Sequence, residues 1–164
     1  MSDFYNFVVN LRAIRDYKEE PLSDEHLDAI LEAARWTGSS KNLQNWSFVV
    51  VQDEEQLSRV ADCALYSDPL RASAATIVIV NEPGGYEFDS GRVAQNMMLA
   101  AAALGVASCP ITLHQDRDVA DLLGLGADQS CRYAVAFGYP TATAAPKNKG
   151  GRKPIGELVH WERI

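Results

Sequence analysis

Hydroxyl, carboxamide and indole groups are concentrated in one short stretch of the chain, residues 39–51, which reads SSKNLQNWSFVVV. Side chains of these types donate and accept hydrogen bonds, as a polar ligand requires. An apolar helical pattern precedes the stretch and an apolar strand pattern closes it, so its polar half is predicted to be a loop between a helix and a strand. Loops held by rigid elements often carry binding groups, which favours a ligand-binding role. A capped structural turn with Trp46 as a core aromatic is the alternative.

Positive charge is gathered near the two ends of the chain, in the pair Arg12 and Arg15 and in the group Lys147, Lys149, Arg152 and Lys153. Guanidinium groups bind phosphate through paired hydrogen bonds, so the two groups would form a phosphate clamp if the fold brings them together. A solvated basic loop and an N-terminal salt bridge are the alternative, because surface charges usually contribute little.

Other phosphate-binding and catalytic motifs are missing from the sequence. Gly124 and Gly126 lack the third glycine of a dinucleotide-binding loop and precede a predicted strand, and no Walker-type sequence occurs. The cysteines and histidines show neither metal-ligand spacing nor a nucleophile and base pair. No metal site, disulfide or catalytic residue is therefore predicted among Cys63, Cys109, Cys131, His26, His114 and His160.

The composition predicts one domain, spanning residues 1–164. The chain has 164 residues, of which 47% are hydrophobic and 23% charged, enough for one real core but not for two ordinary domains. Its net charge of -7 argues against nucleic acid or an anionic membrane surface as a partner. No apolar run reaches the roughly 20 residues that span a bilayer, and residues 1–11 carry an acidic residue where a signal peptide is basic. We therefore expect a cytoplasmic protein.

Helical and strand patterns alternate along the chain. The spacing of apolar residues, with capping signals such as Pro21 and Ser23, predicts helices over residues 3–11, 24–35, 54–64, 90–104 and 116–123. Apolar runs predict strands over residues 47–52, 75–80, 106–111 and 133–137, and Gly and Pro predict a loop over residues 82–88. This order predicts a single domain of the α/β or α+β class.

Two features indicate a second copy of the chain. The predicted helix over residues 90–104 is apolar nearly all round, so it should lie in the interior or be covered by another subunit. Residues 138–154 are rich in Gly, Pro, Ala and Lys and show no periodicity, yet they are followed by ELVHW (157–161), which is typical of a terminal strand. A long loop that ends in a strand suggests an arm that reaches across to a partner.

Four segments resemble the nitroreductase family in the right order. LRAIRDY (11–17) resembles the family's N-terminal R-R-S-x-R-x-F/Y, and SSKNLQNW (39–46) resembles S-x-x-N-x-Q-P-W. DSGRVAQNMMLAAAALGVASCPI (89–111) resembles the central helix and the following strand, and RKPIGELVHWERI (152–164) resembles the C-terminal end. Four matches in order are much harder to obtain by chance than any one of them.

The resemblance implies an FMN-dependent NAD(P)H oxidoreductase with FMN bound at the interface of a homodimer. Its fold would be α+β with α/β-type layers: a central, mostly antiparallel sheet flanked by helices, with a C-terminal arm extending to the dimer partner. NAD(P)H and a nitroaromatic, quinone or similar acceptor would use the same face of the flavin in turn, by ping-pong hydride transfer through flavin N5.

The resemblance also implies which residues contact FMN. The phosphate and ribityl end would be held by Arg12, Ala13, Arg15 and Arg152. The second subunit would contribute Ser39, Ser40 and Asn42, supported by Gln44 and Trp46. The isoalloxazine ring would lie beside Pro110, Ile111 and Thr112. No protein acid, base or nucleophile is required, because the flavin carries the hydride chemistry.

The chain departs from the family pattern at several positions. Leu11 and Ala13 stand where many members have arginine and serine, and Asn45 replaces the usual proline. Thr112 and Leu113 occupy places where larger members have glutamate and glycine. Two alternative functions stay open: a flavoenzyme of the same fold with a dedicated biosynthetic or flavin-cleaving reaction, and a flavin-binding module without turnover.

Overall fold

The centre of the molecule is a four-stranded sheet. The computed structural model describes residues 2–146 and 151–164. The strands are β1 (Trp46–Val51), β2 (Ala75–Asn81), β3 (Ala107–Thr112) and β4 (Ser130–Gly138), in the order β1-β2-β4-β3. Each neighbouring pair is antiparallel, so that Val78 of β2 lies between Val49 of β1 and Ala134 of β4. β1 and β3 are therefore the two edge strands.

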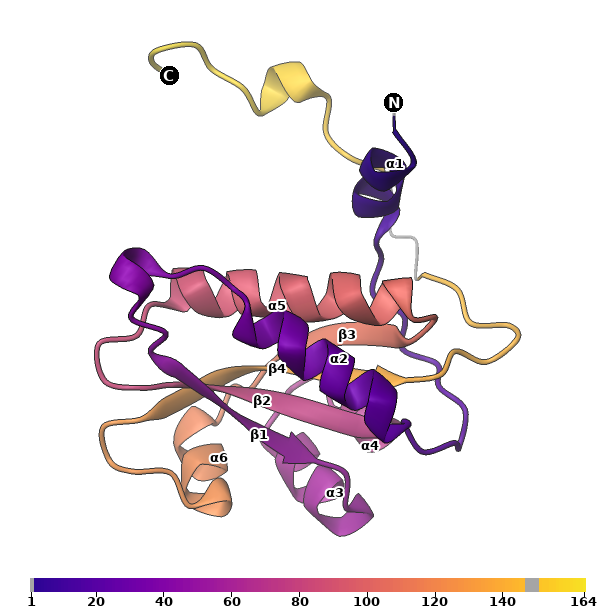
Figure 1. The fold of residues 1–164 in the computed structure, drawn as a ribbon, viewed down its shortest axis with the longest axis vertical. Helices are drawn as coiled ribbons and strands as arrows, with labels where there is room; N and C mark the ends of the chain where they lie inside the picture. Colours follow the sequence, from indigo (N-terminus) through magenta and orange to yellow (C-terminus); the bar gives the residue numbers. More distant parts are fainter. Residues whose placement is uncertain (1, 147–150) are drawn as a thin grey trace.

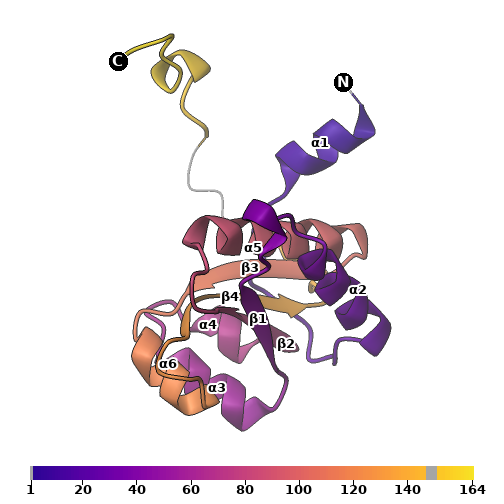
Figure 2. The ribbon, with the colours of Figure 1, turned by 60° about the vertical axis from the view of Figure 1, so that its left-hand side comes forward.

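Helices cover both faces of this sheet (Figures 1 and 2). One face is covered by α2 (Asp24–Arg35) and α5 (Glu87–Ala103), and the other by α3 (Glu54–Asp62), α4 (Asp68–Arg71) and α6 (Asp116–Leu123). A 3-10 turn, η1 (Ser40–Asn42), lies between α2 and β1. The predicted α+β fold with an antiparallel sheet flanked by helices is confirmed.

Side chains of the central strands point alternately to the two faces of the sheet, and this divides the core into two halves. On β2, Val78 and Val80 pack on the side of α3 and α6, whereas Ile77 and Ile79 pack on the side of α2 and α5. All four side chains are buried. A strand that is covered on both faces has no side turned to solvent, which is why its sequence is a continuous apolar run instead of an alternating one.

The helices begin and end where capping residues stand. Ser23 Oγ accepts a hydrogen bond from the His26 backbone N–H at the start of α2 (3.3 Å), and Asp53 Oδ1 accepts one from Gln56 N–H at the start of α3 (2.9 Å). α6 ends at Gly124, which has the left-handed φ of 70° that favours glycine. The inner face of α5, which includes Met97 and Met98, is buried within this chain.

Most predicted elements agree with the observed ones to within one or two residues, but α5 and β4 each begin three residues earlier than predicted. α5 begins at Glu87, so part of the predicted 82–88 loop is helical; acidic Glu87 and Asp89 stand in its first turn, where the helix dipole favours negative charge. The four-residue helix α4 was not predicted, because so short a segment has no apolar periodicity.

The predicted terminal strand over residues 157–161 is wrong. A short 3-10 turn, η2 (Ile155–Glu157), takes up the start of this segment, and the rest of residues 151–164 is irregular and exposed. A strand requires a neighbour to pair its backbone groups, and in Figures 1 and 2 this segment projects away from the sheet. That it is an arm which reaches a partner stays a prediction, as does the single domain over residues 1–164.

The N-terminal helix α1 (Asp3–Asn10) also projects from the body, on the same side as the C-terminal segment (Figure 1). None of its residues is buried, and Phe4, Tyr5, Val8 and Val9 are exposed. Within residues 2–146 and 151–164, no helix has the length and apolar character needed to cross a membrane.

A close contact between Tyr17 and Gly138 ties the segment that follows α1 to the sheet. An added Cβ at Gly138 would lie 2.8 Å from both Cβ and Cγ of Tyr17. The Tyr17 hydroxyl donates to the backbone oxygens of Ile14 (2.9 Å) and Ala136 (3.4 Å), and its ring is buried. Glycine at position 138 is therefore what lets the tyrosine ring lie flat against β4.

We predict that Gly138→Ala lowers the free energy of unfolding by about 1 to 3 kcal/mol, because the new methyl group overlaps the Tyr17 side chain and the backbone must shift. Denaturant unfolding monitored by circular dichroism measures the change. Gly91→Ala is the control: an added Cβ on this exposed α5 residue has nothing within 4 Å, so it should raise stability by about 0.5 to 1 kcal/mol. Equal stability of the Gly138→Ala variant and the parent chain would contradict the packing argument.

Candidate functional site

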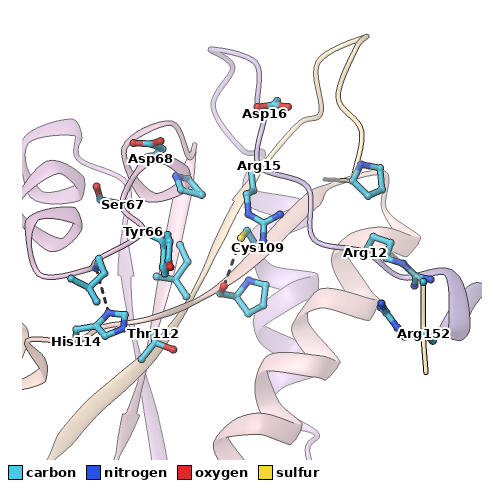
Figure 3. Close-up of a pocket in the computed structure, with 16 residues that line it drawn as sticks. Arg12, Arg15, Asp16, Tyr66, Ser67, Asp68, Cys109, Thr112, His114 and Arg152 are labelled. Carbon is cyan, nitrogen blue, oxygen red and sulfur yellow. Dashed lines mark hydrogen bonds between the residues drawn. The ribbon is translucent and has the colours of Figure 1, made fainter. Parts of the chain in front are cut away.

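A cavity of about 1220 Å³ opens along the edge strand β3 (Figure 3). One end is formed by the segment that follows α1 and by the C-terminal segment, and the other by the connection between α3 and α4. The strand between them contributes Cys109, Pro110, Ile111 and Thr112. Residues from four separate parts of the sequence thus meet at one edge of the sheet.

The position of β3 at the sheet edge explains how it can line a cavity. Pro110 has no backbone N–H, and within sheets proline is confined to edge strands or bulges. Its side chain is exposed, whereas its neighbours Cys109 and Ile111 are buried. The start of β3, which lies near the arginines, is held by a backbone hydrogen bond from Ile14 N–H to Ser108 O (3.0 Å). The free side of the strand beyond it faces the cavity.

Three arginines reach this cavity from opposite ends of the sequence, Arg12 and Arg15 from one and Arg152 from the other. In Figure 3, Arg12 and Arg152 lie at one end of the cavity, with Arg15 nearer its middle. Arg12 Nη1 donates to the backbone oxygens of Val9 (2.8 Å) and Leu11 (2.7 Å), which leaves its Nε and Nη2 donors for a ligand. The structure therefore brings the two predicted halves of the arginine clamp together.

The segment that carries Arg12 and Arg15 is fixed to the sheet. Besides the contacts of Tyr17 described above, Lys18 N–H donates to Tyr139 O (2.8 Å). Burial raises the pKa of Tyr17 above its ordinary value, so its hydroxyl remains a hydrogen-bond donor. These contacts set the backbone from which the arginine side chains extend. Lys147 and Lys149, the other predicted cations, lie outside the described residues.

The opposite wall of the cavity was not identified from the sequence. It consists of Leu65, Tyr66, Ser67, Asp68 and Pro69, together with His114. His114 Nδ1 accepts a hydrogen bond from Leu65 N–H (3.3 Å), and Cys63 O accepts from the backbone N–H groups of His114 and Gln115 (both 3.1 Å). The only local signal was Ser-Asp-Pro, a sequence typical of a helix start, which says nothing of a cavity.

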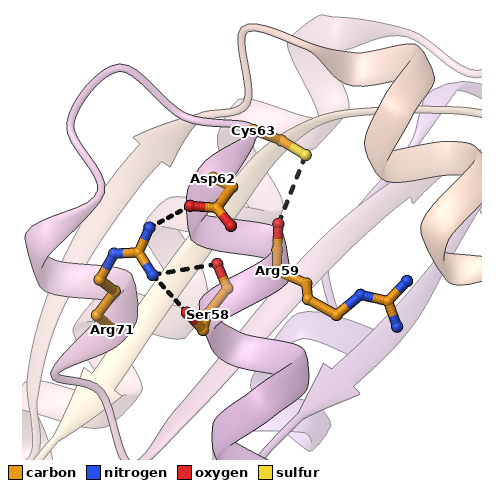
Figure 4. Close-up of polar contacts among 5 residues, drawn as sticks. All are labelled: Ser58, Arg59, Asp62, Cys63 and Arg71. Carbon is orange, nitrogen blue, oxygen red and sulfur yellow. Dashed lines mark hydrogen bonds and ion pairs between the residues drawn. The ribbon is translucent and has the colours of Figure 1, made fainter.

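Arg71 makes polar contacts between α4 and α3, which flank this wall (Figure 4). From the end of α4, its Nη1 donates to Ser58 Oγ (2.5 Å) and Ser58 O (3.4 Å), and its Nη2 forms an ion pair with Asp62 of α3. α4 is thereby attached to α3, and the connection between them is held at both ends. Tyr66, in contrast, is 80% exposed, so its ring is available to a ligand in the cavity.

The charge of the cavity is opposite to that of the chain. Among its lining residues, Arg12, Arg15 and Arg152 outnumber Asp16 and Asp68. The chain as a whole carries a net charge of -7. A locally positive cavity in an acidic protein favours a small anion over an extended polyanion, which the remaining surface would repel.

Two of the three thiols of the protein are not set up as nucleophiles. All three cysteines are described and buried, and they form no disulfide. Burial raises the pKa of the Cys63 thiol and raises that of Cys131 to about 11, so neither is a thiolate near neutral pH. No group of His, Cys, Asp and Glu within the described ranges could hold a metal ion.

The remaining predicted site residues do not line this cavity. Ala13 lies between two arginines of the lining but packs against the core, and the polar loop lies elsewhere. That loop, residues 39–44, is beside the N-terminal end of α5, whereas the chain leaving α1 passes the C-terminal end of α5 (Figure 1). Because the loop leads into β1 and the cavity borders β3, they lie at opposite edges of the sheet, about three strand spacings or roughly 14 Å apart. The predicted site residues in this loop are Ser39, Ser40, Asn42 and Gln44.

A sequence model of the nitroreductase family matches residues 9–82 and 64–139 of this chain. A protein of Archaeoglobus fulgidus, provisionally named an NADH dehydrogenase/NAD(P)H nitroreductase, is 28% identical over 151 residues, which cover 85% of this chain and 87% of that protein. The structure of an FMN-dependent nitroreductase from Clostridium difficile R20291 is similar with a TM-score of 0.84 and 26% identity, covering 98% of this chain and 99% of the other. Nitroreductase A of Vibrio parahaemolyticus gives a TM-score of 0.90 and 26% identity, covering all of this chain (100%) and 78% of the other. The family match extends over both the arginine segment and β3, and this chain belongs to the nitroreductase family.

Proposed function

We propose that the protein is an FMN-dependent oxidoreductase that takes a hydride from NADH or NADPH and reduces a nitroaromatic, a quinone or a similar acceptor. The observation that carries the proposal is the meeting of Arg12, Arg15 and Arg152 at one cavity beside β3. FMN has a phosphate at one end and a flat ring at the other, and the cavity has a basic end and a strand-lined end.

The donor set suits the phosphate of FMN. Arginine presents several N–H donors in a planar fork, which matches phosphate oxygens in paired hydrogen bonds. Three such groups would neutralise a phosphate that carries close to two negative charges. The cavity volume of about 1220 Å³ accommodates a ligand of this size together with part of a second one.

Pro110, Ile111 and Thr112 would lie beside the isoalloxazine ring. They are the cavity-lining residues of a strand that is fixed on its other side by six paired positions with β4. A ring held against such a strand keeps one orientation while substrates exchange, and precise orientation is the protein's share of catalysis when a cofactor carries the reaction.

The chemistry places few demands on the side chains. When bound, FMN supplies the hydride acceptor and donor that the polypeptide lacks. The protein binds the phosphate, orients the ring and leaves room beside it, where Tyr66 and Leu65 border the cavity. NAD(P)H and the acceptor would enter this room one after the other, which gives ping-pong kinetics. The buried, protonated thiols of Cys63 and Cys131 fit this division of labour.

A homodimer would complete the site. Ser39, Ser40 and Asn42 lie at the opposite edge of the sheet from the cavity of their own chain, so we propose that they contact the flavin of the partner subunit, with Gln44 and Trp46 supporting their loop. Exposed apolar side chains on α1 and on the C-terminal segment, among them Phe4 and Trp161, would be covered in the dimer. Residues 1–164 would form one domain of this assembly.

We expect the purified protein to be yellow, with the absorbance bands of oxidised flavin. Under anaerobic conditions these bands should bleach on addition of NADH or NADPH and return on addition of a quinone. A colourless protein that cannot be reconstituted with FMN would contradict the proposal. Tight FMN binding without reduction by either nicotinamide would instead select the non-catalytic flavin-binding module.

Arg152→Ala should weaken FMN binding about 10- to 100-fold, since the loss of a hydrogen bond between charged groups corresponds to about 1.5 to 3 kcal/mol. Fluorescence titration of the apoprotein with FMN measures the dissociation constant. The matched control is Arg117→Ala, which removes an exposed arginine of α6 that pairs with Asp121 and does not line the cavity. Unchanged FMN affinity of the Arg152→Ala protein would instead support the alternative that Arg152 belongs to a solvated basic loop.

Mixing two defective chains tests whether the polar loop serves the partner. If Arg15 acts in its own subunit and Asn42 in the other, a mixed dimer of Arg15→Ala and Asn42→Ala chains contains one intact site. Random mixing should then restore about one quarter of the parental quinone reductase activity, because half of the dimers are mixed and each has one working site. Mixing Arg15→Ala with Arg152→Ala chains should restore nothing, since both residues line the cavity of the same chain. No recovery in the first mixture would show that the loop does not act across the interface.

A further inference from the structure

The polar loop has an unusual backbone. Lys41, Asn42 and Gln44 have φ values of 52°, 56° and 52°, in the left-handed region that side chains other than glycine disfavour. Three such residues within four positions cannot be held by local preference alone. Backbone of this kind persists only where surrounding contacts over-determine it. The contacts that hold the loop are therefore part of whatever the loop does.

The start of the loop is held by α5. Arg92 Nη1 donates to Gly38 O (2.5 Å) and pairs with Asp89 (3.4 Å), and Asn96 Nδ2 donates to Thr37 Oγ1 (2.8 Å). These bonds fix the residues that precede Ser39. Within the loop, Ser39 Oγ accepts from Gln44 N–H (2.9 Å), which closes the turn.

The end of the loop is held by Glu82, the residue that follows β2. Its carboxylate accepts a hydrogen bond from Ser47 Oγ (2.5 Å), and its backbone N–H donates to Asn45 O (3.2 Å). On its other side, Gln129 Nε2 donates to both carboxylate oxygens (3.0 and 2.8 Å), while Gln129 Oε1 accepts from Gly126 N–H (2.7 Å). One side chain thus connects the start of β1 with the loop before β4.

We propose that Glu82 is a positioning residue for FMN binding: by holding Ser47 through its carboxylate, next to the bond from its backbone N–H to Asn45, it fixes the left-handed loop 39–44 in the shape that contacts the flavin of the partner subunit. This inference rests on the proposed function, because it takes the loop to be part of the flavin site. Glu82 is assigned a positioning role because its carboxylate is taken up by Ser47 and Gln129.

The network requires a carboxylate at this position. Ser47 and Gln129 both direct donors at the same side chain, and an ionised carboxylate accepts from both, whereas a carboxamide has one oxygen and an opposing NH₂ group. Gln129 cannot simply turn over, because its own oxygen is used by Gly126 N–H. Glu82→Gln should therefore keep the bond from Ser47 and lose much of the bond from Gln129, while Glu82→Ala loses both.

The first measurement is the FMN dissociation constant of the full-length protein, by fluorescence titration. Glu82→Ala should bind FMN about tenfold more weakly, and Glu82→Gln should lie between it and the parent. Ser47→Ala should weaken binding as well, and the double variant should be no weaker than Glu82→Ala alone, because both changes break one connection. The control is Glu87→Ala, which removes a nearby glutamate whose side chain accepts from Tyr133 and does not contact the loop.

The second measurement follows the loop without any flavin. Trypsin cleaves after Lys41, an exposed residue in the middle of the loop, and mass spectrometry reports the rate at that bond. Glu82→Ala apoprotein should be cut there about tenfold faster than the parent, while cleavage after Arg117 on α6 should not change. Glu82→Gln, which keeps the Ser47 bond, should be cut at an intermediate rate and serves as the test if the alanine variant does not fold.

The outcomes separate the inference from the proposed function. If the parent protein does not bind FMN, the proposed function fails, and the trypsin rates alone decide whether Glu82 holds the loop. If the parent binds FMN and the Glu82 variants bind it equally well, the inference is overturned and the proposed function stands. Weaker FMN binding without faster cleavage after Lys41 also overturns it, since Glu82 would then act by another route.

Discussion

The burial of β2 and β4 on both faces is the constraint from which the rest of the structure follows. These central strands carry apolar side chains in both directions, so helices must cover the sheet on both sides. Such a sheet has no open face on which a ligand could bind. Only its two edges remain, and all the predicted binding groups lie at one edge or the other.

The two edges carry different parts of the proposed site. The β3 edge has the arginines and the cavity, and the β1 edge has the polar loop and its left-handed backbone. Two covered strands separate the edges within one chain. The antiparallel order β1-β2-β4-β3 is therefore the physical reason for proposing a site shared between two subunits.

Much of the fold could be predicted from the sequence, because local signals determine it. Ser23, Asp53 and Gly124 mark helix ends, and the apolar runs mark the strands. The prediction of a terminal strand failed for the opposite reason. A strand depends on a neighbouring strand, and the pattern of ELVHW does not show whether such a neighbour is present. The cavity wall around Tyr66 was missed because only tertiary packing brings it to β3. The meeting of Arg12 with Arg152 was left open by residue types alone and was implied by the family resemblance.

Asn45 shows how a departure from a family pattern can keep the same physical effect. Proline at this position would stiffen the loop by fixing φ and removing conformations from the unfolded chain. Asn45 restrains the same backbone through its side chain instead, because its Nδ2 donates to Pro83 O (3.2 Å). Its backbone oxygen also accepts from Glu82 N–H (3.2 Å). The approach is close enough to exclude a side chain on the facing residue, because a Cβ on Gly85 would lie 2.6 Å from Asn45 O. The bond from Glu82 N–H and the approach of Gly85 both use a backbone carbonyl, which proline also has. The contact specific to asparagine is the one with Pro83 O, so here a side chain ties the loop to the segment after β2 where a proline ring would restrain φ.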